Sequence, residues 1–166
     1  VANRVTIELS EGEEAVLYKY ASILTSLNHD PETMVNSGKE ILESAMHAGF
    51  DKLFMEHAQV WENKRAHSDI MIEGDTSAQQ GIRFNIFQIN QTYTGKDERL
   101  NIGPKGFTGE KYGGSTYWDT EAYMIPFYLS TAPEQVSRNL LVYRYKHLKK
   151  AIENAEKLGF SKGAAL

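Results

Sequence analysis

The sequence contains no cysteine at all. Disulfide scaffolds, zinc–thiolate sites and thiol nucleophiles are therefore excluded among its 166 residues. No apolar run approaches the ~18 residues that a membrane-spanning helix requires. No basic stripe is present either, and the net charge is −4, so neither nucleic acid nor a membrane is an expected partner. The lack of cysteine fits a protein of the reducing cytoplasm.

Two families of catalytic pattern are also missing. Neither the P-loop pattern Gly-x4-Gly-Lys-Ser/Thr nor Gly-x-Gly-x-x-Gly occurs, so a nucleotide site is not favoured. The 5 histidines include no pair at i, i+4 and no His-Glu-x-x-His motif. The sequence therefore predicts no metal site and no cofactor.

Glycine is concentrated in one stretch. Residues 103–121 read GPKGFTGEKYGGSTYWDTE and hold five of the chain's 13 glycines. Glycines at this density let the backbone approach a ligand closely. Trp118 and Asp119 follow and offer a flat apolar face beside a carboxylate. A sugar uses both, because its C–H face stacks on an indole and its hydroxyls donate to carboxylate oxygens.

Core packing is the alternative interpretation of the Trp118-Asp119 pair. Tyr117 and Phe84 are secondary candidates for contact with a sugar, and for them too the alternative is core packing. Asp119 and Glu121 are not expected to form a catalytic pair, because residues two apart on a helix do not face each other. We expect Glu121 to be tied to backbone or to a basic group.

The first third of the chain changes from strand to helix periodicity. Alternating residues predict a strand over 5–9 and a longer one over 14–25, joined by a polar turn, as an antiparallel pair within a larger sheet. Asp30 as N-cap and Pro31 at N1 predict a helix to about residue 48. Asp51 is expected to cap a second helix.

The rest of the chain reads as three helices and a long loop. Residues 74–77 predict the cap of a helix whose apolar side chains lie on most faces, so we expect burial on more than one side. Residues 94–116 read as a functional loop. A helix over 117–129 should be interrupted near Pro126. Residues 131–134 resemble a capping box, and the following helix is expected to break near His147.

Two blocks of the sequence resemble glycoside hydrolase family 65, the disaccharide phosphorylases. They are residues 83–128, which contain TGEKYGGSTYWDTE, and residues 140–160. Relatives that act on trehalose or kojibiose tend to carry Gly-His before the aromatic-Trp-Asp, whereas Gly114-Ser115-Thr116 is similar to the maltose-specific members. Because family members are several times longer, the resemblance implies that this chain is an internal piece.

The resemblance implies a mixed fold in three parts. Residues 1–28 correspond to the last strands of an N-terminal antiparallel β-sandwich. Residues 29–76 correspond to a helical linker, and residues 77–166 to the first helices of an (α/α)6-barrel catalytic domain. In the family, the Trp-Asp pair grips the glucose whose anomeric bond breaks.

The implied reaction is the inverting phosphorolysis of maltose to β-glucose 1-phosphate and glucose, with inorganic phosphate as co-substrate. In the family, the general acid Glu and the phosphate site lie beyond the segment that this chain matches. The chain therefore carries no catalytic residue and is expected to be inactive alone, within a cytoplasmic homodimer. Three alternatives stay open: another α-glucoside such as trehalose or kojibiose, hydrolysis in place of phosphorolysis, and a non-catalytic helical binding module.

Overall fold

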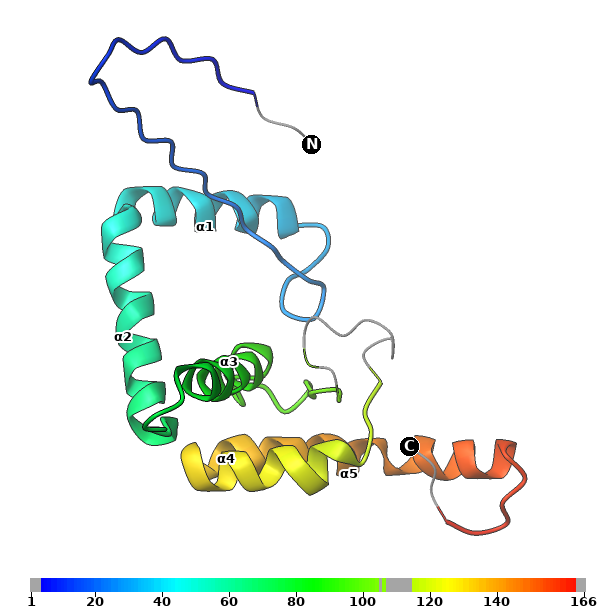
Figure 1. Cartoon of the computed structure of the whole chain (residues 1–166). Helices are drawn as coiled ribbons and strands as arrows, with labels where there is room; N and C mark the ends of the chain where they lie inside the picture. The colour runs from blue at the N-terminus through cyan, green and yellow to red at the C-terminus, as the bar shows by residue number, and fades with distance from the viewer. Residues whose placement is uncertain (1–3, 105, 107–114, 164–166) are drawn as a thin grey trace. The chain divides into compact units, whose positions relative to one another are not determined.

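The computed structural model describes residues 4–104, 106 and 115–163 (Figure 1). The chain divides into two compact units, Val1–Val60 and Trp61–Leu166. In chain order the helices are α1 (Met34–Ala48), α2 (Phe50–Ser68), α3 (Thr76–Thr92), a π-helical turn η3 (Thr120–Met124), α4 (Ile125–Thr131) and α5 (Glu134–Lys157).

The expected antiparallel strands are not formed in the described residues 4–28. The polar turn does form, because Glu13 N donates to the carbonyl of Ser10 at 3.1 Å. The flanking residues carry no strand assignment, and the side chains of Val16 and Ile23 are 70% and 93% exposed. A strand pair without a packed face is marginal in water, so the alternation of apolar residues alone does not produce a sheet.

Helix α1 begins three residues later than its sequence signals predict. The Asp30 carboxylate accepts from Glu32 N at 2.9 Å, and its carbonyl accepts from Thr33 N at 3.1 Å. These bonds close a separate turn, so the helix starts at Met34 instead of Pro31. This is the usual competition between a local Asp turn and a helix cap.

The packing inside the first unit is local. Gly38 on α1 lies against the extended segment, where the Ser22 hydroxyl donates to its carbonyl at 3.3 Å. The rings of Tyr18 and Phe50 lie 5.5 Å apart. These contacts attach residues 18–24 to the helices without giving them regular structure.

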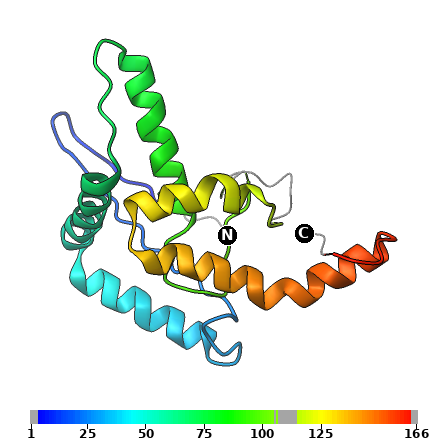
Figure 2. The same ribbon diagram turned by 90° about the horizontal axis from the view of Figure 1, so that it is seen from below.

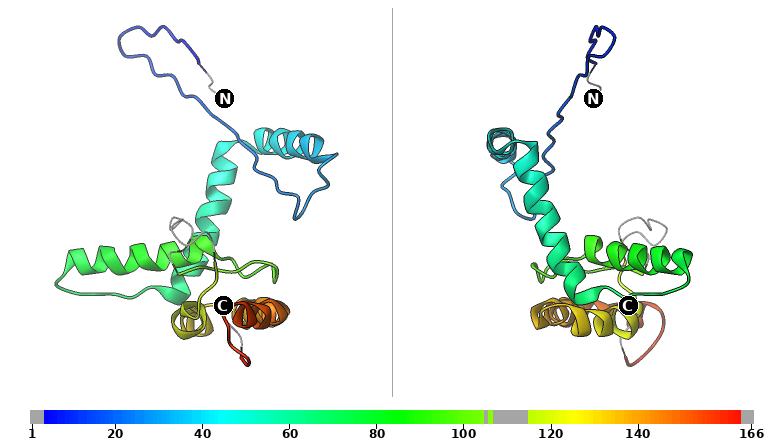
Figure 3. Two further views of the ribbon diagram at one scale, coloured as in Figure 1. Left: turned by 90° about the vertical axis from the view of Figure 1, so that its right-hand side faces the viewer. Right: turned by 60° about the vertical axis from the view of Figure 1, so that its left-hand side comes forward.

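Helix α3 starts as its sequence predicts and packs differently. Asp75 is the N-cap, and its carboxylate accepts from Ala78 N at 2.9 Å. Only Ile86 and Asn90 of this helix are buried, whereas Phe84 is 56% exposed. The two buried residues are four apart, so they lie on one face of the helix. Helix α3, which Figure 3 shows from the side, therefore buries one face instead of several.

The core of the second unit lies between α4, α5 and the irregular segment before them. Helices α4 and α5 run alongside each other in Figure 2. The buried apolar side chains of this core are Tyr93, Ile102, Ile125, Tyr128, Val136 and Leu140.

The predicted capping box before α5 and the predicted break within it are both wrong. The Thr131 hydroxyl donates back to the carbonyl of Phe127 at 2.7 Å inside α4, and Pro133 occupies the N-cap without a side-chain bond. Helix α5 runs unbroken through His147, whose ring stacks on that of Tyr143 at 4.2 Å. Stacking on the preceding turn supports a continuous helix at this point.

Candidate functional site

The helix that carries the Trp-Asp pair opens with a π-helical turn, Thr120–Met124. Ile125 N donates to the carbonyl of Thr120, five residues back. Pro126, at the start of α4, has no N–H and crowds the carbonyl of the turn before it. The interruption expected near Pro126 is therefore present, as a widened turn of the kind often found at functional sites.

Trp118 lies at the exposed edge of this turn. Its side chain is 60% exposed, and its ring centroid lies 5.8 Å from that of Tyr123, which is 66% exposed. This contact places Tyr123 beside the candidate residues. No sequence pattern singles out Tyr123, because its place beside Trp118 depends on how the two side chains are oriented in the folded chain.

The two carboxylates of the stretch have different surroundings. Asp119 is half-buried and has no hydrogen-bond partner among the described residues. Glu121 is bound by Arg144 of α5, which donates from Nε at 2.5 Å and from Nη2 at 2.8 Å. As expected, Glu121 is tied to a basic group, and Asp119 is left available for a ligand.

Arg144 makes a third contact in the same place. Its Nη2 also donates to the backbone carbonyl of Tyr117 at 2.5 Å. The guanidinium thus holds the backbone before Trp118 and the side chain after Asp119. Nothing in the local sequence signals this pairing, because the partners lie 23 and 27 residues apart.

The start and the end of the glycine-rich stretch are fastened to each other. The hydroxyl of Thr120, 1% exposed, donates to the carbonyl of Ile102 at 2.8 Å. The amide of Asn101 donates to the hydroxyl of Thr116. A Cβ on Gly103 would lie 3.0 Å from the carbonyl oxygen of Ser115, which is a tight contact, so this close approach favours glycine. Residues 105 and 107–114, with three of the five glycines, lie outside the described residues.

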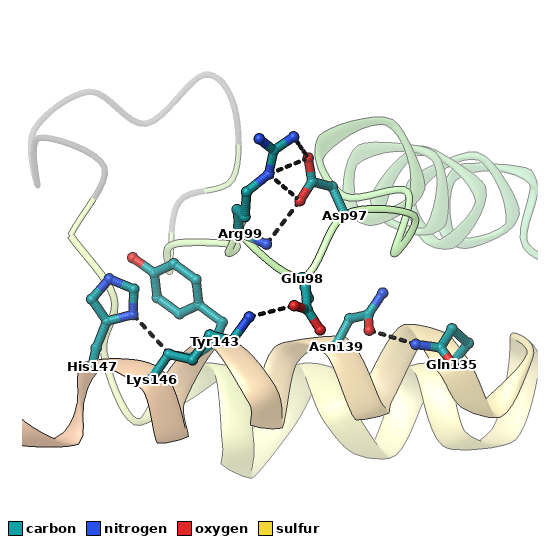
Figure 4. A network of polar contacts seen from close by, with 8 residues as sticks. All are labelled: Asp97, Glu98, Arg99, Gln135, Asn139, Tyr143, Lys146 and His147. Atoms are coloured by element: carbon teal, nitrogen blue, oxygen red, sulfur yellow. Dashed lines mark hydrogen bonds and ion pairs between the residues drawn. The ribbon is translucent and has the colours of Figure 1, made fainter. Parts of the chain in front are cut away.

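Helix α5 also holds the segment that leads into this stretch (Figure 4). The amide of Asn139 donates to the carbonyl of Gly95 at 2.6 Å, and Lys146 pairs with Glu98. Asp97 accepts from Arg99, which holds the pKa of Asp97 down at about 2. The predicted loop is thus attached to one helix on both sides.

The two secondary candidates lie in different places. Tyr117 is half-buried directly before Trp118. Phe84 lies within α3, and in the part of the chain that the structure describes no hydrogen bond or ring contact joins it to Trp118 or Asp119. The structure therefore brings Tyr117 to the candidate site and does not bring Phe84 there.

A cavity of about 200 Å³ lies elsewhere, between the end of α2 and α3. The rings of Trp61 and Phe87 line it, tilted to each other with their centroids 4.8 Å apart. Its buried Asn90 already donates to the carbonyl of Ile86 at 3.1 Å and accepts from Lys64 at 3.5 Å. Burial, and then the charge of Lys96, lower the pKa of Lys64. Asp69 at the same cavity accepts two hydrogen bonds from Arg83, and none of the predicted site residues lines the cavity.

The described residues hold neither a metal-ligand cluster nor a membrane-spanning helix. No group of three or more His, Cys, Asp or Glu side chains is placed to hold a metal ion there. None of the described helices is both long and apolar enough to cross a membrane.

Comparison with known proteins gives matches along the chain. Residues 83–166 match the glycosyl hydrolase family 65 central catalytic domain, and residues 1–64 match the N-terminal domain of that family. The chain is 50% identical to the maltose phosphorylase of Bacillus subtilis (strain 168) over 91% of its length. It is 38% identical over 96% of its length to the alpha,alpha-trehalose phosphorylase of Thermoanaerobacter brockii. It is 38% identical over 90% of its length to the kojibiose phosphorylase of Caldanaerobacter subterraneus subsp. tengcongensis.

These relatives are much longer than this chain. The matched part covers 20%, 20% and 19% of the three relatives, so the chain spans about a fifth of the length of each. The match to the N-terminal domain precedes the match to the catalytic domain along the chain. On the extent of the catalytic-domain match and the identity to these phosphorylases, the chain belongs to glycosyl hydrolase family 65.

Proposed function

We propose that this chain is part of a maltose phosphorylase, an inverting enzyme that converts maltose and phosphate into β-glucose 1-phosphate and glucose. The observation that carries the proposal is the identity of 50% to a maltose phosphorylase, against 38% to a trehalose and to a kojibiose phosphorylase. The sequence Gly114-Ser115-Thr116 before the Trp-Asp pair supports the same substrate.

In this proposal Trp118 and Asp119 bind the glucosyl ring whose anomeric bond breaks. The exposed indole of Trp118 takes the C–H face of the ring, and the carboxylate of Asp119 accepts hydrogen bonds from its hydroxyls. Both residues act by positioning. Their contacts accelerate the reaction to the extent that they tighten as the ring flattens toward the transition state.

Tyr123 is a further candidate for this contact, because its ring lies beside that of Trp118. Tyr117 adjoins the pair, and Phe84 reaches a sugar only if the ligand extends toward α3. The general acid and the phosphate-binding groups come from residues outside this chain. Phosphate then attacks the face of the ring opposite the leaving group, in the place of the water of an inverting hydrolase.

The division of the chain follows the same proposal. Residues 1–28 are the last strands of the N-terminal β-sandwich, residues 29–76 the linker, and residues 77–166 the start of the (α/α)6 barrel. The match of residues 1–64 to the family's N-terminal domain supports this order. In the whole protein, upstream strands supply the pairing that residues 4–28 lack. We also propose that the whole protein forms a homodimer in the cytoplasm.

The second candidate function is a related activity on another α-glucoside, with trehalose and kojibiose as the first substrates to test. The relatives at 38% identity support it. Hydrolysis and a non-catalytic helical binding module are the remaining alternatives. Assays of the whole protein on maltose, trehalose and kojibiose, each with and without phosphate, separate all four.

The chain alone is expected to have no phosphorylase activity, because it carries no general acid and no phosphate site. The measurement is phosphate-dependent glucose release from maltose by the purified chain. Turnover approaching the usual enzyme range of about 1 to 10³ per second would contradict the assignment as an incomplete piece.

In the whole enzyme, Asp119→Asn keeps the shape of the side chain and removes its charge. Losing one or two hydrogen bonds to a charged group, each worth about 1.5–3 kcal/mol, lowers kcat/KM for maltose roughly 10²-fold or more. Trp118→Ala is expected to cost a comparable amount through lost stacking. If Glu121 is purely structural, Glu121→Gln lowers the melting temperature more than the turnover number.

The matched control is Glu134→Gln, which neutralises an exposed carboxylate in the first turn of α5. It is expected to leave kcat/KM unchanged. Near-normal kinetics for Asp119→Asn in an enzyme that folds and binds phosphate normally would remove the sugar-binding role from this stretch.

A further inference from the structure

One guanidinium binds groups that lie before and after the Trp118-Asp119 pair in the sequence. Arg144 of α5 donates two hydrogen bonds to the Glu121 carboxylate, at 2.5 and 2.8 Å, and one to the carbonyl of Tyr117 at 2.5 Å. The Arg144 side chain is 16% exposed, and that of Glu121 is 34% exposed. The contact is therefore a bidentate pair partly withdrawn from water, which is the geometry that gives an Arg–carboxylate pair its specificity.

The three bonds of Arg144 fasten the chain on both sides of the pair. Tyr117 lies immediately before Trp118, and Glu121 lies two residues after Asp119. The carbonyl of Tyr117 also accepts from Thr120 N at 3.2 Å, so the guanidinium binds at the point where the helix begins. The planar fork of arginine can serve a carboxylate and a carbonyl together, whereas the point charge of lysine cannot reproduce that arrangement.

A second hydrogen bond attaches the turn to the segment before the glycine-rich stretch. The buried hydroxyl of Thr120 donates to the carbonyl of Ile102 at 2.8 Å. The flanking polar groups of Tyr117, Thr120 and Glu121 are thus all engaged, whereas the Asp119 carboxylate has no partner among the described residues. The turn is built so that its neighbours are held and its ligand-binding candidates remain available.

We propose that Arg144 is a positioning residue of the sugar site, acting through Glu121 and the Tyr117 carbonyl to hold the Trp118 indole and the Asp119 carboxylate in their binding orientation. This inference rests on the function proposed above. Without Arg144, the turn samples other orientations, and ordering it on binding costs free energy. Contacts that matter most in the transition state suffer most from misplacement, and an error of about 1 Å can cost roughly 10²-fold in rate.

The experiment compares Arg144→Lys and Glu121→Gln in the whole phosphorylase. Arg144→Lys keeps the charge and loses the fork; Glu121→Gln keeps the shape and loses the charge. Each is expected to lower kcat/KM for maltose about tenfold or more, mainly through kcat, and to leave the KM for phosphate unchanged. The control is Lys146→Gln, which breaks the exposed pair with Glu98 on the same helix and is expected to change neither constant.

A double-mutant cycle of Arg144→Lys with Asp119→Asn separates positioning from stability alone. If Arg144 acts through the pair, the double variant loses less than the sum of the two single losses, because the orientation of an Asp119 side chain already disabled no longer matters. Additive losses, or a lower melting temperature with unchanged kcat/KM, would overturn the positioning role.

Failure of this inference is distinguishable from failure of the proposed function. If Asp119→Asn is itself harmless, the sugar contact is absent and the function proposal loses its site. A second outcome is that Asp119→Asn lowers kcat/KM while Arg144→Lys and Glu121→Gln give active enzymes whose losses in kcat/KM add to that of Asp119→Asn. In that case the sugar contact stands and the positioning role does not. Should Arg144→Lys fail to fold, a second cycle of Glu121→Gln with Asp119→Asn decides the question.

Discussion

Two stretches of this chain lack regular secondary structure, and they differ sharply in burial. Residues 4–28 leave their apolar side chains in water, with Ile23 93% exposed. Residues 93–104 are equally irregular, yet Tyr93 and Ile102 are each 2% exposed and belong to the core of the second unit. The sequence of the first stretch is the more strand-like of the two, so local propensity does not explain the difference.

The difference in burial depends on which groups donate hydrogen bonds to the backbone carbonyls of each stretch. In the second stretch Asn139 donates to the carbonyl of Gly95 and Thr120 donates to that of Ile102. Irregular backbone can be buried once its polar groups are satisfied, and here helical side chains satisfy them. In the first stretch a strand needs the backbone of another strand, and no such partner lies among the described residues of its unit.

The largest expected effect is the contrast between Leu140→Ala and Ile23→Ala. Leu140 is 1% exposed in the core, so its truncation should destabilise α4 and α5 by about 2–5 kcal/mol. The Ile23 side chain is already in water, so Ile23→Ala should change the free energy of local unfolding by no more than about 0.5 kcal/mol. Amide hydrogen exchange of the two regions measures both. Equal effects would show that residues 4–28 are packed after all.

The second contrast uses two glycines with positive φ. Gly95 has φ +71°, and a Cβ there would lie 2.6 Å from Val136 Cγ2 and 2.8 Å from Val136 Cα. Gly95→Ala therefore adds overpacking to backbone strain and should cost roughly 2–4 kcal/mol in the second unit. Gly12 has φ +87° with nothing within 4 Å of a Cβ, so Gly12→Ala is the matched control that carries strain alone.

Exchange of the α5 amides reports the outcome for both glycine variants. Gly95→Ala should accelerate exchange in α5, and Gly12→Ala should leave it unchanged. If the α5 amides of Gly95→Ala exchange as slowly as those of the unchanged protein, the close approach of Gly95 to α5 is not what holds the irregular segment against that helix.

The smallest effect separates two buried tyrosines whose rings lie 5.8 Å apart. The Tyr128 hydroxyl donates to the carbonyl of Ile89 at 3.0 Å, so Tyr128→Phe should cost about 1 kcal/mol. The Tyr93 hydroxyl is buried without a partner among the described residues, so Tyr93→Phe should be neutral or slightly stabilising. Urea midpoints of the helical circular dichroism signal test whether the two variants differ in sign.

Alkaline pH gives a control for the tyrosine pair. Burial, and then the charge of Asp97, raise the pKa of Tyr93 from 10.0 to about 12. Between these values the unfolded chain has released a proton that the folded chain keeps, so stability is full below pH 10.0 and falls as the pH rises toward about 12. Tyr93→Phe should flatten this fall. It should not abolish it, because burial also raises the pKa of Tyr128.

Much of the helical layout could be predicted from local signals. The Asp75 cap, the end of α1 at Ala48 and the interruption at Pro126 all depend on residues a few positions apart. The errors arose where local rules compete. Asp30 closed a turn of its own before α1, and Thr131 bonded back into α4 where a cap was expected. Both side chains can satisfy either arrangement, so the local sequence does not choose between them.

The candidate site divides in the same way. Trp118 and Asp119 stand out from the sequence because a flat apolar ring beside a carboxylate is a recognisable chemistry. Arg144 does not, because its partners are distant in the chain and any of the 18 lysines and arginines could have filled the role. Tyr123 does not stand out either, because its contact with Trp118 depends on the folded arrangement of the two side chains.

By itself, the sequence determined the family and most helix positions, and it singled out the residues proposed to bind a sugar, since each of these depends on neighbours along the chain. Only the tertiary structure decided which carboxylate is engaged and which is available. That choice was made by Arg144, which α5 places against Glu121 and the Tyr117 carbonyl while Asp119 remains without a partner among the described residues. The physical reason is that hydrogen-bond partners are assigned by packing, which brings together groups that the chain holds far apart.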